Sequence, residues 1–317
     1  MKIGKISRTG GRPHNQDYAD YAVLNGHICI AVADGLGAYA GSEVAGETAV
    51  TFALNKFRKA VEKGEDLFSG VMMNKLFKGA HSAILKAKTG APNLRAGCTT
   101  LSLFISDGEK FIVAHEGDTR IYFFKDNQLC FYSKDHSLAT AAVARGEILE
   151  SEIRKHKDQN KLTRVLGSDY YVQPDFKIYR NYSANDSILI CSDGFWEHIY
   201  EDEMEKALAS SEGAIDALEN LEKILLSRAD QENCDNYTAV LLRFTDEDAP
   251  IIERITAMEE DKTEDAIEPI AEEEVAEDLA ETVEEVTVSE QTEEVTSLDE
   301  SEVVSEVEVV TETEENL

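Results

Sequence analysis

The chain has 317 residues and carries 63 acidic against 31 basic side chains, a formal net charge of −32. A chain this acidic is repelled by phosphate backbones and by anionic lipid surfaces, so we expect it to bind neither nucleic acid nor a membrane surface. No stretch reaches the roughly 20 apolar residues of a membrane helix, and no apolar segment follows the N-terminal lysines as in a secretory signal. The five cysteines are scattered and show no CxxC spacing, which favours a cytoplasmic location.

The chain begins with strands and a pair of helices. Two apolar runs, 18–24 and 27–33, are separated by an Asn-Gly dipeptide that favours a two-residue hairpin. The residue pattern then predicts two consecutive helices, 42–59 and 67–89. An antiparallel strand pair followed by a helix pair is therefore expected.

The middle of the chain continues as short strands joined by tight turns. Four strands are expected at 99–106, 110–115, 120–125 and 128–132, with an Asp-Gly turn between the first two and an Asp-Asn turn between the last two. The later elements, in chain order, are strands 176–180 and 187–191, helices 201–209 and 213–229, and a strand at 238–244. Hairpins instead of βαβ units predict an α+β domain over residues 1–247, with antiparallel sheets covered by helices.

The last part of the chain differs in composition from the rest. Residues 248–317 hold 27 acidic and two basic side chains and no Phe, Trp or Tyr. Such a segment buries too little apolar surface to offset its conformational entropy, so we expect an acidic, disordered tail. Two functions fit it: a self-repelling, solubilising tail, or a docking segment for a basic partner.

Four aspartates stand where apolar strands end or begin. Asp34 follows the run 28–33, Asp193 follows 188–192, Asp118 follows 111–117, and Asp235 comes shortly before the last strand. Strand ends cluster in a packed sheet, and clustered carboxylates repel one another unless a cation or a proton compensates. Oxygen ligands without a Cys or His pair suit hard cations, so the pattern predicts a Mg²⁺ or Mn²⁺ site.

A glycine-rich approach near the N-terminus supplies an anion-binding candidate. Arg12 follows Thr9-Gly10-Gly11, and a guanidinium group matches a phosphate group with two hydrogen bonds. Asp17 lies five residues farther and adds another carboxylate. The combination is typical of a metal-dependent phosphoester hydrolase.

Eight short motifs in order resemble the PP2C-type (PPM family) protein serine/threonine phosphatases, in their bacterial branch. The resemblance spans residues 1–244 and leaves the tail outside. The motifs are Arg12-Pro-His-Asn-Gln-Asp17, Asp34-Gly-Leu-Gly37, Gly97-Cys-Thr-Thr100, Gly117-Asp-Thr-Arg120, Asp135-His-Ser137, Leu162-Thr-Arg-Val-Leu-Gly167, Ser192-Asp-Gly-Phe-Trp196 and Asp235-Asn-Tyr-Thr238. The resemblance implies a four-layer α-β-β-α sandwich, with two antiparallel sheets flanked by helix pairs.

The resemblance also implies a site with two catalytic metal ions. Asp34 matches the carboxylate that bridges the two ions, and the backbone carbonyl of Gly35 matches a further ligand. Asp193 and Asp235 match the other carboxylate ligands of one ion. A metal-activated water then attacks phosphorus without a phosphoenzyme intermediate.

Further roles follow from the same resemblance. Asp17 matches a residue that holds metal-bound water, Asp118 matches a ligand of a third, weaker ion, and Arg12 matches the phosphate-binding arginine. Residues 139–160 match a mobile flap that influences substrate choice. Leu36 stands where some members place a proton-donating His, so the general acid is left open.

The implied function is hydrolysis of phosphoserine and phosphothreonine on proteins that a serine/threonine kinase has modified. One alternative is an inactive, PP2C-like adaptor that uses its acidic tail to bind a partner, although intact carboxylates disfavour it. Another is a phosphatase acting on a small molecule or a regulatory protein. His136 is expected to be a structural hydrogen-bonding residue, and Trp196 to pack beneath the site.

Overall fold

The computed structural model describes residues 1–37, 41–91, 97–169, 171–180, 182–245 and 251–255. The chain divides into two compact units, Met1–Glu260 and Asp261–Leu317, and the second unit lies outside the described residues. The expected disordered tail from residue 248 therefore stays a prediction. The strand β11, Ile251–Ile255, falls inside that range.

One sheet has five strands in the order β2-β3-β4-β5-β8, and all neighbours are antiparallel. Its strands are β2 Asp17–Leu24, β3 His27–Asp34, β4 Leu101–Ser106, β5 Lys110–Glu116 and β8 Asp175–Arg180.

The other sheet has six strands in the order β11-β1-β10-β9-β6-β7. Besides β11, its strands are β1 Lys2–Arg8, β10 Tyr237–Arg243, β9 Ser187–Cys191, β6 Arg120–Lys125 and β7 Gln128–Tyr132. Its neighbours are antiparallel, except that β11 runs parallel to β1.

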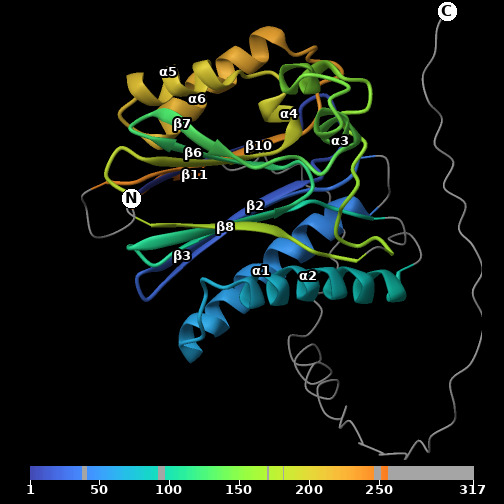
Figure 1. Ribbon diagram of the computed structural model, residues 1–317, viewed down its shortest axis with the longest axis vertical. Helices are drawn as coiled ribbons and strands as arrows, with labels where there is room; N and C mark the ends of the chain where they lie inside the picture. Colours follow the sequence, from blue (N-terminus) through green and yellow to red (C-terminus); the bar gives the residue numbers. More distant parts are fainter. Residues whose placement is uncertain (38–40, 92–96, 170, 181, 246–250, 256–317) are drawn as a thin grey trace, which may run out of the picture. The chain divides into compact units, whose positions relative to one another are not determined.

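Helices cover the outer face of each sheet, which gives four layers (Figure 1). The helices α1 Ser42–Lys63 and α2 Gly70–Gly90 pack on the five-stranded sheet. The six-stranded sheet is covered by α5 Glu201–Ser210 and α6 Ala214–Arg228, with the short α4 Asp193–Trp196 at its end. The predicted sandwich of two antiparallel sheets flanked by helix pairs is confirmed.

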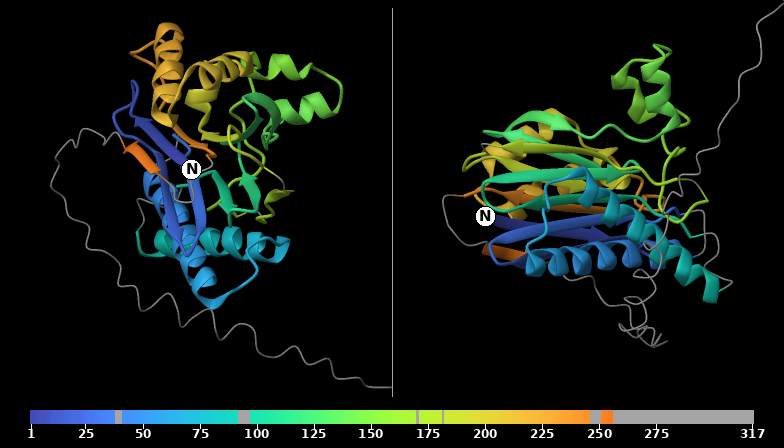
Figure 2. Two further views of the ribbon diagram at one scale, coloured as in Figure 1. Left: turned by 90° about the vertical axis from the view of Figure 1, so that its left-hand side faces the viewer. Right: turned by 60° about the horizontal axis from the view of Figure 1, so that its bottom comes forward.

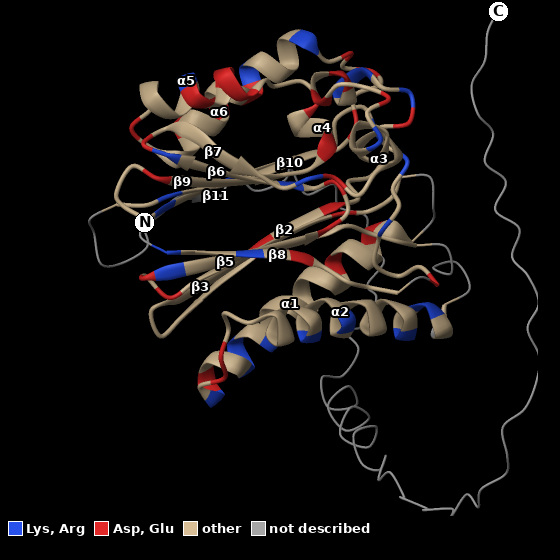
Figure 3. Ribbon diagram, viewed as in Figure 1, with Lys and Arg blue, Asp and Glu red and all other residues tan. Residues whose placement is uncertain are grey.

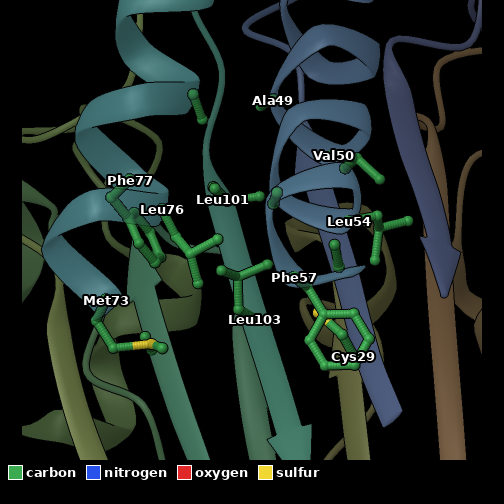
Figure 4. Close-up of a cluster of buried hydrophobic side chains, with 14 of the residues drawn as sticks. Cys29, Ala49, Val50, Leu54, Phe57, Met73, Leu76, Phe77, Leu101 and Leu103 are labelled. Atoms are coloured by element: carbon green, nitrogen blue, oxygen red, sulfur yellow. The ribbon is translucent and has the colours of Figure 1, made fainter. Parts of the chain in front are cut away.

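Each pair of adjacent layers shares an apolar core, so the central strands are buried on both faces. Figure 4 shows the core under α1 and α2, where Phe57, Leu76 and Phe77 meet Leu101 and Leu103 of β4. Separate clusters fill the space between the sheets and the space beneath α5 and α6. The core between the sheets fixes the position of one sheet relative to the other, so that their ends lie side by side.

The strand β1 was not among the predicted strands. Its sequence, KIGKISR, has few residues of high β-propensity and contains a glycine. It forms because its backbone pairs with β10 along its whole length, from Lys2 opposite Arg243 to Arg8 opposite Tyr237. That pairing partner lies more than 200 residues away, beyond the reach of a local pattern.

Among the residues that the structure describes, no helix is both long enough and apolar enough to cross a membrane.

Candidate functional site

Five aspartates lie at or beside strand ends of the two sheets. Figure 3 colours acidic residues red and shows several of them on the ribbon near α4 and β2. Asp17 begins β2 and Asp34 ends β3, and the two lie opposite each other in the antiparallel register. Asp193 follows β9, while Asp235 precedes β10, and these two strands are antiparallel, so both residues lie at one end of the other sheet. Asp118 lies in the loop where the chain passes from β5 in one sheet to β6 in the other.

Hydrogen bonds fix several of these aspartates. Ser192 Oγ donates to Asp17 Oδ2 at 2.6 Å, and the backbone N–H of Gly194 donates to Asp193 Oδ1 at 2.6 Å. Trp196 Nε1 donates to the backbone carbonyl of Asp118 at 3.0 Å. Residues 192–196 therefore bind Asp17 and Asp118, which come from two distant parts of the chain, and also fix the Asp193 side chain of the same segment.

The motif around Thr99 and Thr100 positions the Asp34-Gly35 turn. The backbone N–H of Asp34 donates to Thr100 Oγ1 at 2.9 Å, and Thr99 Oγ1 donates to the carbonyl of Asp34 at 3.0 Å. A Cβ on Gly35 would lie 2.5 Å from the carbonyl oxygen of Ser42, so the start of α1 packs too close for a side chain. Glycine is required here by this close approach.

Asn236 joins the loop that carries Asp235 to the loop that carries Arg12. Its side-chain carbonyl accepts from the backbone N–H of Gln16 at 2.8 Å, and its amide donates to the carbonyl of His14 at 3.0 Å. Arg12 Nη2 in turn lies 2.9 Å from Asp235 Oδ2. The Arg12 side chain is 47 % exposed, so its guanidinium is open to solvent at the rim of the carboxylate group.

The carboxylates raise one another's pKa values. Burial, followed by the charges of Asp17, Asp193 and Asp118, raises the pKa of Asp34 well above its usual range. Burial and the Asp193 charge do the same to Asp118, and burial and the Asp235 charge raise the pKa of Asp193. Burial raises the pKa of Asp17 to about 7, against the opposing effect of its hydrogen bond from Ser192. Arg12 pairs with Asp235, and among the described residues no ion pair compensates the other four carboxylates.

The group fits divalent cations. The donors are all oxygen atoms, which hard cations such as Mg²⁺ and Mn²⁺ prefer. Asp17 is only 6 % exposed, and its buried Oδ1 atom has no hydrogen-bond partner among the described residues. An acceptor oxygen buried in this way is costly unless an ion or water satisfies it.

The raised pKa values predict a pH dependence of the metal-free protein. A carboxyl group whose pKa is raised by folding stabilises the folded state most below its unfolded pKa of about 4, and this contribution is lost as the pH rises through the folded value. For Asp17 this window extends to about pH 7. In EDTA, we expect Tm to fall by roughly 5–10 °C between pH 5.5 and pH 8, measured by thermal unfolding. Saturating Mg²⁺ should remove most of the slope, and a flat metal-free profile would contradict the clustering.

Glu197 is a neighbour of this group that the sequence analysis missed. Burial, and then the charges of Asp193 and Asp235, raises its pKa to about 8. Gln159 Nε2 donates to Glu197 Oε1 at 2.6 Å. The available signal was its spacing, because residues four apart share a helix face, and Glu197 comes four residues after Asp193.

A second polar group lies beside the loop of Asp118. His115, His136 and Asp175 bring ligand-type atoms within 4.8 Å of one another. The backbone N–H of Gly117 donates to His136 Nδ1 at 3.1 Å, and His136 Nε2 lies 3.3 Å from Asp175 Oδ2. Arg164 contacts both His136 and Asp175. This is therefore a hydrogen-bonded network that already contains a cation, and His136 has the structural role expected of it.

Comparisons with known proteins identify the family of the chain. A family model described as Protein phosphatase 2C matches residues 4–233. The chain belongs to the protein phosphatase 2C family. The serine/threonine phosphatase Stp of Listeria welshimeri is 26 % identical over 234 residues, which cover 73 % of this chain and 90 % of that protein.

Solved structures share the fold. The crystal structure of the serine/threonine phosphatase Stp1 from Staphylococcus aureus superposes with a TM-score of 0.67 at 22 % identity, covering 76 % of this chain and 94 % of that one. The catalytic domain of the phosphatase PstP in complex with two manganese ions gives a TM-score of 0.63 at 24 % identity, covering 77 % and 98 %. The family resemblance inferred from the eight motifs is confirmed, and the chain is a phosphoprotein phosphatase of a metal-dependent family.

Proposed function

We propose that this protein phosphatase 2C removes phosphate from phosphoserine and phosphothreonine with two Mg²⁺ or Mn²⁺ ions held by the five aspartates. The observation that carries the proposal is the convergence of Asp17, Asp34, Asp118, Asp193 and Asp235 from both sheets at one end of the sandwich. Their mutual effect on pKa values and the unpartnered Asp17 oxygen support cations as occupants.

The residues divide into three roles. Asp34 and the carbonyl of Gly35 would be ligands of the two ions, and Asp193 and Asp235 would be further ligands of one of them. Asp17 holds coordinated water, because its carboxylate is fixed by Ser192 and keeps a free oxygen. Asp118 contributes with Asp193 to a third, weaker site.

Bound divalent cations supply Lewis acidity and lower the pKa of a coordinated water to near neutrality. Arg12 binds the phosphoryl oxygens: its guanidinium is exposed, and it pairs with Asp235 at the rim of the group. Leu36 has no proton to give, so solvent protonates the leaving oxygen. Nothing favours the alternative of an inactive adaptor, since the five carboxylates are all present.

The substrates that we propose are cytoplasmic proteins phosphorylated by a serine/threonine kinase. The names of the bacterial relatives, which are serine/threonine phosphatases, support this class of substrate. For the acidic residues 248–317, a basic protein partner is the proposal that their charge supports.

Metal removal tests the proposed function. The full chain should hydrolyse p-nitrophenyl phosphate and a phosphothreonine peptide with Mn²⁺ or Mg²⁺, and lose at least about 10²-fold in rate in EDTA. Adding back Mn²⁺ should restore the rate, which separates metal loss from unfolding. A rate that is unchanged in EDTA, or no turnover with either metal from folded protein, would overturn the proposal.

A further inference from the structure

The chain segment between β7 and β8 makes few contacts with the two sheets and their helices, as judged from the described residues. This 138–161 segment contains α3 Leu138–Ala144 and the 3-10 helix η2 Glu150–Lys155, and Figure 2 shows it projecting from the sheets. Its two ends are joined to each other, because the backbone N–H of Leu138 donates to the carbonyl of Lys161 at 2.9 Å. The rest of the segment is held by side chains.

Arg154 is the most buried of the charged side chains that join this segment to the body. Its side chain is only 10 % exposed, and its guanidinium pairs with Glu201 of α5 and donates to the backbone carbonyl of Trp196. The guanidinium carbon also lies 5.4 Å from the centre of the Trp196 ring and 5.3 Å from that of Tyr200. A guanidinium group between a carboxylate, a carbonyl and two aromatic rings uses both its hydrogen-bonding edge and its face.

Trp196 connects Arg154 to the carboxylate group. It is 2 % exposed, and its indole N–H donates to the backbone carbonyl of Asp118 at 3.0 Å. The guanidinium carbon of Arg120 lies 3.5 Å from its ring centre, and Arg120 forms two hydrogen bonds with Asp135, at 2.8 and 2.7 Å. A series of contacts therefore leads from η2 through Trp196 to the main chain of Asp118.

We propose that Arg154 is a positioning residue for the metal site: when the 138–161 segment is docked, Arg154 holds Trp196, and Trp196 holds the Asp118 loop in the position that binds a divalent cation. The inference rests on the proposed role of Asp118. Docking of the segment then sets the cation affinity at Asp118, and cation binding stabilises docking to the same extent.

The expected change in cation affinity can be taken from other metal sites, where residues that do not bind the metal orient the ones that do. Partners that orient a ligand typically change metal affinity by about 10- to 100-fold when they are removed. Arg154→Ala should therefore raise the cation concentration needed for half-saturation by about tenfold, with kcat at saturating cation close to that of the wild type. Arg154→Lys keeps the charge but lacks the planar fork, so it should restore only part of the affinity.

Trp196 makes the test direct, because it is the only tryptophan in the chain. We would titrate the full chain with Mg²⁺ and follow both tryptophan emission and calorimetric heat. Wild type should change its emission as Mg²⁺ binds, and Arg154→Ala should start from a red-shifted emission and respond at about tenfold higher Mg²⁺. Arg145→Ala is the matched control, because Arg145 lies in the same segment, is exposed and pairs only with the neighbouring Glu147 among the described residues.

The outcomes separate the inference from the proposed function. Normal calorimetric binding with the same Mg²⁺ affinity in wild type and Arg154→Ala would overturn the positioning role and leave the phosphatase site intact. Absence of Mg²⁺ and Mn²⁺ binding in the wild type would overturn both. If Arg154→Ala fails to fold by circular dichroism, Glu201→Gln takes its place, since it removes the ionic partner of Arg154; an unchanged affinity there would equally overturn the inference.

Discussion

Asp193→Asn should reduce phosphatase activity by a factor on the order of 10³ or more while making the metal-free protein more stable. The activity falls because Asp193 is a proposed ligand of the cations; its charge adds to the effect of burial in raising the pKa of both Asp34 and Asp118. The same repulsion destabilises the fold when no cation is bound, so a neutral amide of the same shape relieves it. Hydrolysis of a phosphothreonine peptide and thermal unfolding in EDTA at pH 8 measure the two effects.

The matched control is Asp126→Asn. Asp126 is an exposed turn residue with a φ of +48°, a conformation that Asn tolerates, and it lies outside the carboxylate group. It should keep full activity and an unchanged Tm. Loss of activity in Asp193→Asn together with a lower metal-free Tm would indicate a damaged fold and would count against the metal-site assignment.

Asp135→Ala should lower the free energy of unfolding by about 3–5 kcal/mol. Asp135 and Arg120 are both nearly inaccessible, with side chains 3 % and 4 % exposed, and they form a two-point ion pair. Without the carboxylate, the guanidinium stays buried among Tyr122, the rings of Tyr132 and Trp196 and the more distant Glu201. The free energy of unfolding falls mainly because the Arg120 charge is left buried without its partner, and less because the net stabilisation by the ion pair is lost.

Urea unfolding measures this difference, and Asp135→Asn separates charge from hydrogen bonding, because its amide oxygen keeps one acceptor for Arg120. It should lie between wild type and Asp135→Ala. Glu147→Ala is the control, since the exposed pair of Glu147 with Arg145 contributes little to stability. Equal midpoints for Asp135→Ala and Glu147→Ala would show that Arg120 is satisfied by its other contacts.

Much of the fold could be predicted from local sequence patterns. Apolar runs and turn dipeptides predicted most strands, because the central strands are buried on both faces, and helical periodicity predicted α1, α2, α5 and α6. The strand β1 was not predicted, because it is formed by its backbone pairing with β10 and its side chains give no strand pattern. Likewise the segment of α3 and η2 was expected only as a flap, through the family resemblance.

Candidate residues of the site could also be named from the sequence. Asp34, Asp118 and Asp193 each follow an apolar run that marks a strand, Asp235 precedes one, and Asp17 came from its place near Arg12 in the first motif. Their arrangement could not be derived in the same way. Asp17 lies opposite Asp34 because of the register of one hairpin, but Ser192 reaches Asp17 across 175 residues and Trp196 reaches the Asp118 carbonyl across 78. Glu197 was missed for the same reason: its charge matters only because α4 brings it towards Asp193 and Asp235.

The chain's composition and residue order thus determined which groups carry the chemistry, since strand ends, turns and motifs are local features. Which of them meet was decided by the order of strands in the two sheets and by the crossing of the chain from β5 to β6 at Asp118. The contacts that tie the 138–161 segment to Trp196 arise in the same way. Pairings between distant strands depend on the free energy of the whole packed core, which has no signature in any short stretch of sequence.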